Sequence, residues 1–120
     1  WPQRIESGVS SLDLFSVANL RFEKPDNRVF PCLDLAKQAF KSGGTSCAIL
    51  NAANETAVDA FLKGNIPFHK IPDIIDRVLS SVSKEDVSSI DDVIDADQLA
   101  RAVAAEQIIK VSEMKTTLSL

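Results

Sequence analysis

Apolar residues recur with the period of an α-helix along most of the chain. The pattern is clearest in residues 71–82, where Ile, Val and Leu occupy positions i, i+3, i+4, i+7, i+8 and i+11. Such a stripe predicts an amphipathic helix that buries one face. An earlier helix is expected in the segment PCLDLAKQAFKSGG, where Leu33, Ala36 and Phe40 fall on one face and a pair of glycines supplies the stop.

The segment AILNAANETAVDAFLKGN belongs to a helix expected over residues 46–63, with Gly64 placed to take a left-handed C-cap. Asn51 and Asn54 are poor helix formers, yet they lie in its middle. Counted from Leu50, Asn54 falls at about 40° and Asn51 at about 100°, which places both amides on the apolar face. Two interpretations are open. Either the amides face a ligand, or they bond to backbone at a helix junction. The second is favoured, because no titratable or metal-binding group accompanies them.

A final, alanine-rich helix is expected over residues 96–113, after the polar loop SKEDVSSIDD. Asp95, followed three residues later by Gln98, is the expected capping pair, in which the carboxylate accepts from unpaired N–H groups at the helix start. Four helices with short connections must cover one another's apolar faces. The predicted fold class is therefore all-α, with a domain resembling a four-helix bundle over residues 30–120.

Residues 1–29 do not share this pattern. Their apolar residues are sparse and irregular, and two prolines and a glycine interrupt them. A short helical turn is expected from Ser11, and the residues LRF at positions 20–22 are expected to be extended. We predict that this segment is a linker or arm that packs against another part of the chain or against something outside it.

Composition narrows the function classes. Of 120 residues, 45% are hydrophobic and 25% are charged, which is enough apolar material for one domain with a core. The formal net charge is −4 with both signs interspersed, so nucleic-acid binding is not expected. No apolar run reaches the roughly 20 residues that span a bilayer, so no membrane partner is expected. The first residues lack the layout of a secretory signal.

Few residues offer chemistry. His69 is the single histidine, and no second histidine or cysteine lies near it in sequence, so we expect a cap or loop residue rather than a base or ligand. Asp91, Asp92, Asp95 and Asp97 form an acidic cluster without the glycine and glutamate that a calcium loop requires. Helix capping and interaction with the helix dipole explain these acids more simply.

The remaining candidates are small residues and thiols. Gly43-Gly44 precedes a helix, where an anion could bind, but no phosphate-binding motif or strand accompanies the pair, so we expect a helix–helix turn. Ser46 lies in no nucleophile elbow. Cys32 and Cys47 have no CxxC spacing and are expected to be small buried hydrophobes in a reducing compartment, with a single disulfide as the alternative.

Four stretches of the chain resemble one enzyme family. AILNAANETAV is similar to the ALNAANE signature in the C-terminal domain of 1-deoxy-D-xylulose 5-phosphate reductoisomerases, enzymes of the non-mevalonate isoprenoid pathway. WPQRIESGVSSLDLFSVANLRFEKPD resembles the linker of that family. FPCLDLAKQAFKSGG and IDDVIDADQLAR resemble two more of its stretches, and the order is the same over residues 1–112.

The resemblance implies a division of labour. Family members have an NADPH-binding domain and then a catalytic domain with divalent-metal ligands for Mg²⁺, Mn²⁺ or Co²⁺. This chain resembles the linker, residues 1–29, and the C-terminal helical domain, residues 30–120. No position here matches a family cofactor, metal or catalytic residue, so none is predicted as a site and neither cofactor is expected to bind this chain. The implied partners are the upstream domains and a second subunit of a homodimer, in the cytoplasm or a plastid.

Two alternatives to a catalytically inert domain of that enzyme stay open. One is a free-standing helical module that binds a partner through exposed apolar surface. The other is a small metal-binding protein that uses the acidic cluster. For the enzyme domain, we expect Trp1, Leu14, Phe15 and Phe22 to lose packing when the catalytic domain is absent.

Overall fold

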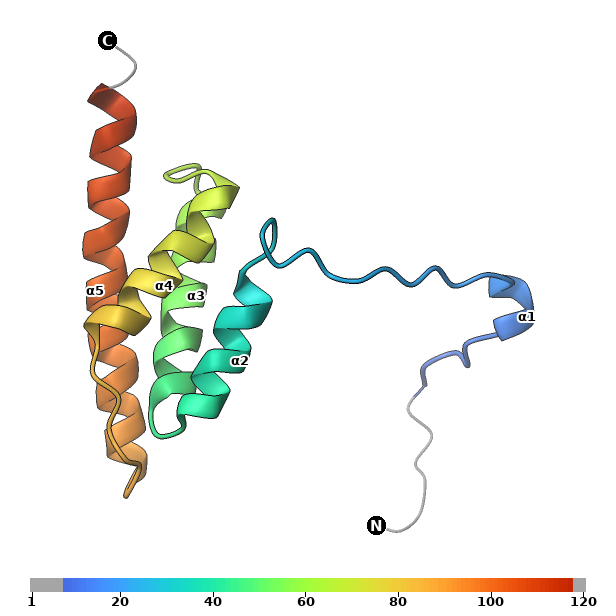
Figure 1. The fold of residues 1–120 in the computed structure, drawn as a ribbon, viewed down its shortest axis with the longest axis horizontal. Helices are drawn as coiled ribbons and strands as arrows, with labels where there is room; N and C mark the ends of the chain where they lie inside the picture. The colour runs from blue at the N-terminus through green and yellow to red at the C-terminus, as the bar shows by residue number, and fades with distance from the viewer. Residues whose placement is uncertain (1–7, 118–120) are drawn as a thin grey trace.

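The computed structural model describes the backbone of residues 8–117 and the side chains of residues 8–113 (Figure 1). No strand occurs within this range, and the prediction of an all-α fold is confirmed. The elements in chain order are α1 Leu14–Val17, α2 Cys32–Ser42, α3 Ser46–Leu62, the 3-10 helix η1 Phe68–Lys70, α4 Ile71–Ser81 and α5 Ile90–Thr117. Helices α2 to α5 pack side by side, while α1 lies apart from them (Figure 1).

Helix α3 is the central element, because it packs against α2, α4 and α5. Its buried positions are mostly alanines, which let neighbouring helices approach closely. Helix α4 supplies the larger core side chains, as its apolar period predicted, and burying each stabilises the fold by about 1.5–3 kcal/mol. The apolar core consists of Ile49, Ala52, Ala53, Ala57 and Ala60 of α3, Ile71, Ile74, Ile75 and Val78 of α4, Ala100 and Ala104 of α5, and Ile66 and Val82 beside them.

Helix α2 buries a different face from the predicted one. Leu33, Ala36 and Phe40 are exposed, Phe40 to 79% of its surface. Ala39 is buried, and Leu35 is packed against the core at its side. The two stripes are neighbours on one helix, and periodicity within a single helix cannot decide which half of a broad apolar surface meets α3.

Helix α5 begins at Ile90 and not at residue 96, and the predicted Asp95 cap is wrong. The cap is a reciprocal pair six residues earlier. The Ser89 N–H donates to Asp92 Oδ2 at 2.7 Å, and the Asp92 N–H donates to Ser89 Oγ at 3.3 Å. This is a capping box with aspartate in place of the usual glutamate, so Asp95 already lies inside the helix.

The residues that precede α2 extend away from the bundle (Figure 1). We call residues 8–29 the N-terminal arm; its residues are exposed throughout. The predicted helical turn is α1, which starts at Leu14 rather than at Ser11, since Asp13 is its N-cap and accepts from the N–H of Phe15 at 3.0 Å. Phe15 is 97% exposed, and Trp1 lies outside the described residues.

Candidate functional site

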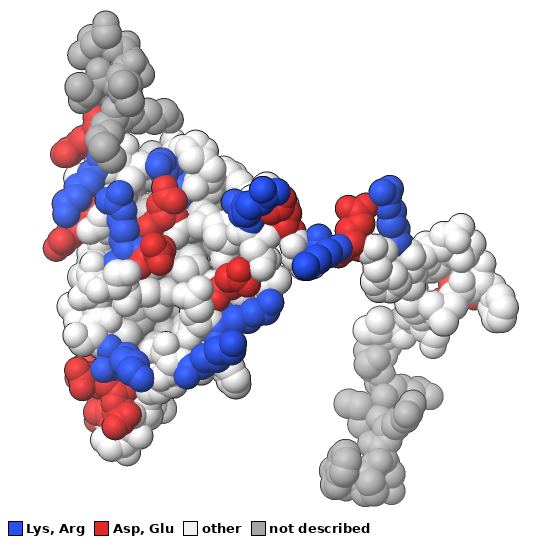
Figure 2. Space-filling view, viewed as in Figure 1, with Lys and Arg blue, Asp and Glu red and all other residues white. Residues whose placement is uncertain are grey.

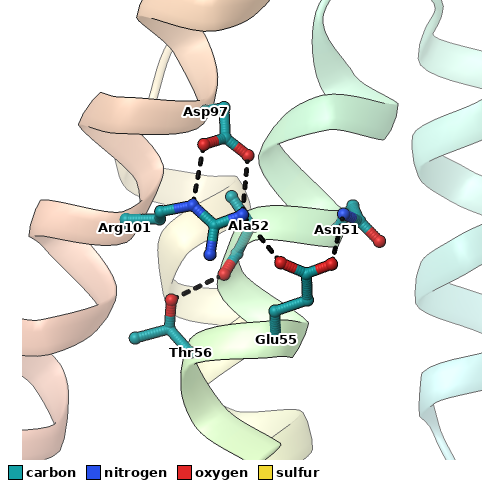
Figure 3. Close-up of polar contacts among 6 residues, drawn as sticks. All are labelled: Asn51, Ala52, Glu55, Thr56, Asp97 and Arg101. Carbon is teal, nitrogen blue, oxygen red and sulfur yellow. Dashed lines mark hydrogen bonds and ion pairs between the residues drawn. The ribbon is translucent and has the colours of Figure 1, made fainter. Parts of the chain in front are cut away.

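A polar network joins α3 and α5 on the surface of the bundle (Figure 3). Arg101 of α5 donates from Nε and Nη2 to both carboxylate oxygens of Asp97, one turn earlier, at 2.7 and 3.1 Å. The same Nη2 donates across to Glu55 Oε2 of α3 at 2.7 Å. Asn51 Nδ2 donates to the other oxygen of Glu55 at 3.2 Å. One guanidinium therefore binds a carboxylate of its own helix and a carboxylate of α3, and the second contact links the two helices.

The ionised groups of this network are paired with one another. Hydrogen bonds from Arg101 and then from Asn51 lower the pKa of Glu55 below its ordinary value. Asp97 and then Glu55 raise the pKa of Arg101, which stays protonated. The side chains of the ion pairs remain 33–54% exposed. A carboxylate held ionised by a fixed cation is a poor general base, so the arrangement connects helices rather than moving protons.

Asn51 and Asn54 of α3 occupy environments that differ from the predicted one. Asn51 is exposed and bonds to a side chain, so the prediction that it faces the core and anchors backbone is wrong. Around the axis of α3, the buried positions are centred about 80° from Leu50, in the direction opposite to that of both asparagines. Asn54 is half-buried at the edge, and no described residue accepts a hydrogen bond from its side chain. The larger apolar residues, Leu50 among them, lie at the margin because alanines form the contact surface.

The Gly43-Gly44 pair forms a helix–helix turn, as predicted, and Thr45 directly after it holds the loop before α5. The Thr45 N–H donates to the Glu85 carbonyl at 2.9 Å, and the Glu85 N–H donates back to Thr45 Oγ1 at 3.0 Å. The Ser46 N–H is bonded to the Gly43 carbonyl at 3.2 Å. Protein acceptors therefore occupy these N–H groups at the start of α3, where an anion would otherwise bind.

The histidine and the acidic cluster are not brought together into one site. His69 lies exposed in η1, beside a hollow of about 460 Å³ whose walls include Phe30, Phe68 and Pro72. Asp92 caps α5, as the capping interpretation predicted for this cluster, and Asp97 binds Arg101. Within the described residues, no three His, Cys, Asp or Glu side chains are grouped so that they could hold a metal ion.

The two cysteines are free thiols in different environments. Cys32 is half-buried, and desolvation raises the pKa of its thiol, which makes it a weak nucleophile. Cys47 is exposed, so the prediction that it is buried is wrong. It sits one residue from the buried Ser46, on the outer side of α3.

Sequence reasoning missed the Arg101 network and the Ser89–Asp92 cap. The first had a partial signal, because Asp97 and Arg101 are spaced i, i+4 on one helix. Its partner Glu55 is 46 residues away, and no local pattern indicates that contact. The cap could have been found by accepting aspartate at the third helical position.

Comparison with known proteins identifies the family of this chain. A family model described as the DXP reductoisomerase C-terminal domain matches residues 1–103. The chain belongs to the DXP reductoisomerase family. It is 53% identical over 106 residues to the 1-deoxy-D-xylulose 5-phosphate reductoisomerase of Nitrosospira multiformis, and 56% identical over 106 residues to that of Methylobacillus flagellatus. Each match covers 88% of this chain and 27% of the relative, so the chain spans about a quarter of the length of these relatives.

Solved structures agree with this assignment. The reductoisomerase of Zymomonas mobilis in complex with NADPH is similar with a TM-score of 0.81 and 42% identity, covering 90% of this chain and 29% of that one. A DOX-P reductoisomerase in complex with magnesium is similar with a TM-score of 0.79 and 33% identity, covering 93% and 30%. Among the described helices of the present chain, none combines the length and the apolar character needed to cross a membrane.

Proposed function

We propose that residues 30–120 are the C-terminal helical domain of a DXP reductoisomerase and that residues 1–29 are the linker that leads to it. The whole enzyme isomerises 1-deoxy-D-xylulose 5-phosphate and reduces it with NADPH to 2-C-methyl-D-erythritol 4-phosphate. The observation that carries the proposal is the match of residues 1–103 to the family's C-terminal domain. Solved relatives in complex with NADPH and with magnesium support the two cofactors.

Within this enzyme, the present chain supplies architecture and no catalytic, cofactor-binding or metal-binding residue. Its polar groups support this role, because Arg101 pairs with Glu55 and Asp97 and because Asp92 caps a helix. The described residues do not fit either cofactor, since no three of them are grouped as metal ligands and the N–H groups at the start of α3 already have protein acceptors. NADPH and the divalent metal, Mg²⁺, Mn²⁺ or Co²⁺, bind the preceding domains.

The partners follow from the same proposal. They are the preceding NADPH-binding and catalytic domains and, in the assembled enzyme, a second subunit of a homodimer in the cytoplasm, or in a plastid or another organelle of a eukaryote. Neither nucleic acid nor a membrane is a partner. The charge distribution supports the absence of a nucleic-acid partner, because Lys and Arg alternate with Asp and Glu over the visible face rather than forming one basic patch (Figure 2).

An activity assay tests the proposal. NADPH oxidation is followed with 1-deoxy-D-xylulose 5-phosphate and Mg²⁺, using the 120-residue chain and the full-length protein that contains it. We expect turnover from the full-length protein and none from the 120-residue chain. Turnover by the short chain would refute its inert role. A full-length protein without turnover would refute the proposal that it is a DXP reductoisomerase.

A second candidate is a free-standing helical module that binds another protein. Its support is the exposed apolar surface of α2, where Phe40 is 79% exposed, and of the N-terminal arm. The DNA sequence that precedes the codon for Trp1 decides between the two candidates. A continuous reading frame that encodes the preceding domains supports the enzyme, and a start codon close upstream supports the module.

A further inference from the structure

One segment of the N-terminal arm has the side-chain pattern of a β-strand. Residues 20–24 run extended between α1 and the turn that precedes α2 (Figure 1). Leu20 and Phe22 are 60% and 87% exposed. Arg21 Nε lies 2.7 Å from Glu23 Oε1, so these alternate side chains lie on the same side of the backbone. Two apolar residues that alternate with two charged residues are typical of a strand with one covered face, and Lys24 at the end of the segment follows Phe22 on the apolar side.

The backbone of this segment has no partner within the described chain. None of the N–H groups of residues 20–24 donates a hydrogen bond to a described residue. The neighbouring stretches differ, because Ala18 donates to the Leu14 carbonyl, and Val29 and Phe30 donate to the carbonyl of Asp26. An extended backbone with unpaired donors and acceptors is a template for pairing with another strand.

We propose that residues 20–24 add as an edge strand to a β-sheet in the preceding part of the same polypeptide, with Leu20 and Phe22 on its apolar layer. The inference rests on the proposed function, which makes that preceding part the remainder of the enzyme. The matched domain is C-terminal in relatives of which this chain covers 27%, so most of their length precedes it. A strand tethered to its own sheet needs only loop closure, and this favours the same chain over a second copy.

Pro25 sets the side on which the strand pairs. Proline has no N–H, and within a sheet it is tolerated on an edge strand where that position points to solvent. The N–H groups of successive strand residues point to opposite edges of the strand, so those of Arg21 and Glu23 point to solvent like the position of Pro25. The N–H groups of Leu20, Phe22 and Lys24 therefore face the neighbouring strand.

Amide hydrogen exchange at single-residue resolution tests the inference on the full-length protein. We expect the N–H groups of Leu20, Phe22 and Lys24 to exchange at least about 100-fold more slowly than those of Arg21 and Glu23. In the 120-residue chain, all five should exchange at similar, fast rates. Uniform protection of the five in the full-length protein, or fast exchange of all five, would overturn the strand. Alternating protection that appears in the short chain and grows with its concentration would overturn the choice of partner in favour of a second copy.

Two proline variants separate strand pairing from simple burial of side chains. Lys24→Pro removes an N–H on the paired side, whereas Glu23→Pro removes the neighbouring one that faces solvent. We expect Lys24→Pro to speed exchange at Phe22 at least about tenfold and Glu23→Pro to leave it nearly unchanged. Equal effects would contradict strand addition. Turnover of NADPH by the full-length protein is measured alongside, so a failed strand is distinguished from a failed enzyme assignment.

Discussion

The turn between α2 and α3 offers a test of how the bundle holds residues 82–89, the loop between α4 and α5. Gly44 has φ +55°, and a Cβ built there would lie 2.2 Å from the Glu85 carbonyl oxygen. Gly64 has φ +77°, and a Cβ there would meet no atom within 4 Å. The two glycines share the left-handed backbone and differ in the space around them. Gly44→Ala and Gly64→Ala are therefore a matched pair.

The expected costs follow from these two geometries. In both variants, alanine in a left-handed conformation costs about 1 kcal/mol. In Gly44→Ala the Glu85 backbone must also move, which disrupts its two hydrogen bonds with Thr45, each contributing about 1 kcal/mol. Thr45 is 1% exposed, so water cannot replace those bonds without further rearrangement. We expect Gly44→Ala to lower the free energy of unfolding by about 3–4 kcal/mol, and Gly64→Ala by about 1 kcal/mol.

Urea unfolding followed by far-ultraviolet circular dichroism measures both changes by linear extrapolation. Thr45→Val adds an internal check, because it removes only the bond from the Glu85 N–H to Thr45 Oγ1 and should cost about 1–2 kcal/mol. Equal destabilisation by the two glycine variants would refute the close contact with Glu85. A neutral Thr45→Val would show that the loop is held by something else.

Three further predictions concern charge and packing. Hydrogen bonds from a neighbouring serine hydroxyl and from backbone N–H groups lower the pKa of Asp92 to about 2. A depressed pKa stabilises the fold at pH values above the unfolded pKa of about 3.9. The free energy of unfolding should therefore fall as the pH drops from about 3.9 to about 2. Asp92→Asn should remove that part of the pH dependence, as urea unfolding at several pH values would show. Arg101→Gln should raise the pKa of Glu55 toward its ordinary value, as NMR titration of the side chain would show; an unchanged pKa would contradict the contact. Ile74→Ala should lower the free energy of unfolding by about 2–5 kcal/mol because Ile74 is fully buried, whereas Leu62→Ala at a 76% exposed position should change it by less than about 0.5 kcal/mol.

The local features that the sequence predicted well are those decided within one helix. The stripe of α4 is confirmed because that helix packs with one continuous face, so period and burial coincide. The all-α class and the Gly43-Gly44 turn follow from equally local signals. The start of α5 was missed by six residues, because a Ser89–Asp92 capping box ends the loop earlier than the alanine-rich run indicates.

The tertiary structure decided which faces meet. Helix α3 is covered on several sides, and its contact surface is a run of alanines, so the most hydrophobic residues do not mark its centre and Asn51 turns outward. Helix α2 exposes Phe40 because only its other edge reaches α3. The link from Arg101 to Glu55 joins residues 46 positions apart. Local periodicity and capping chemistry thus determined the helices and their order, while close packing between distant segments determined which side chains are buried and which charges pair, since these contacts exist only after the chain has folded.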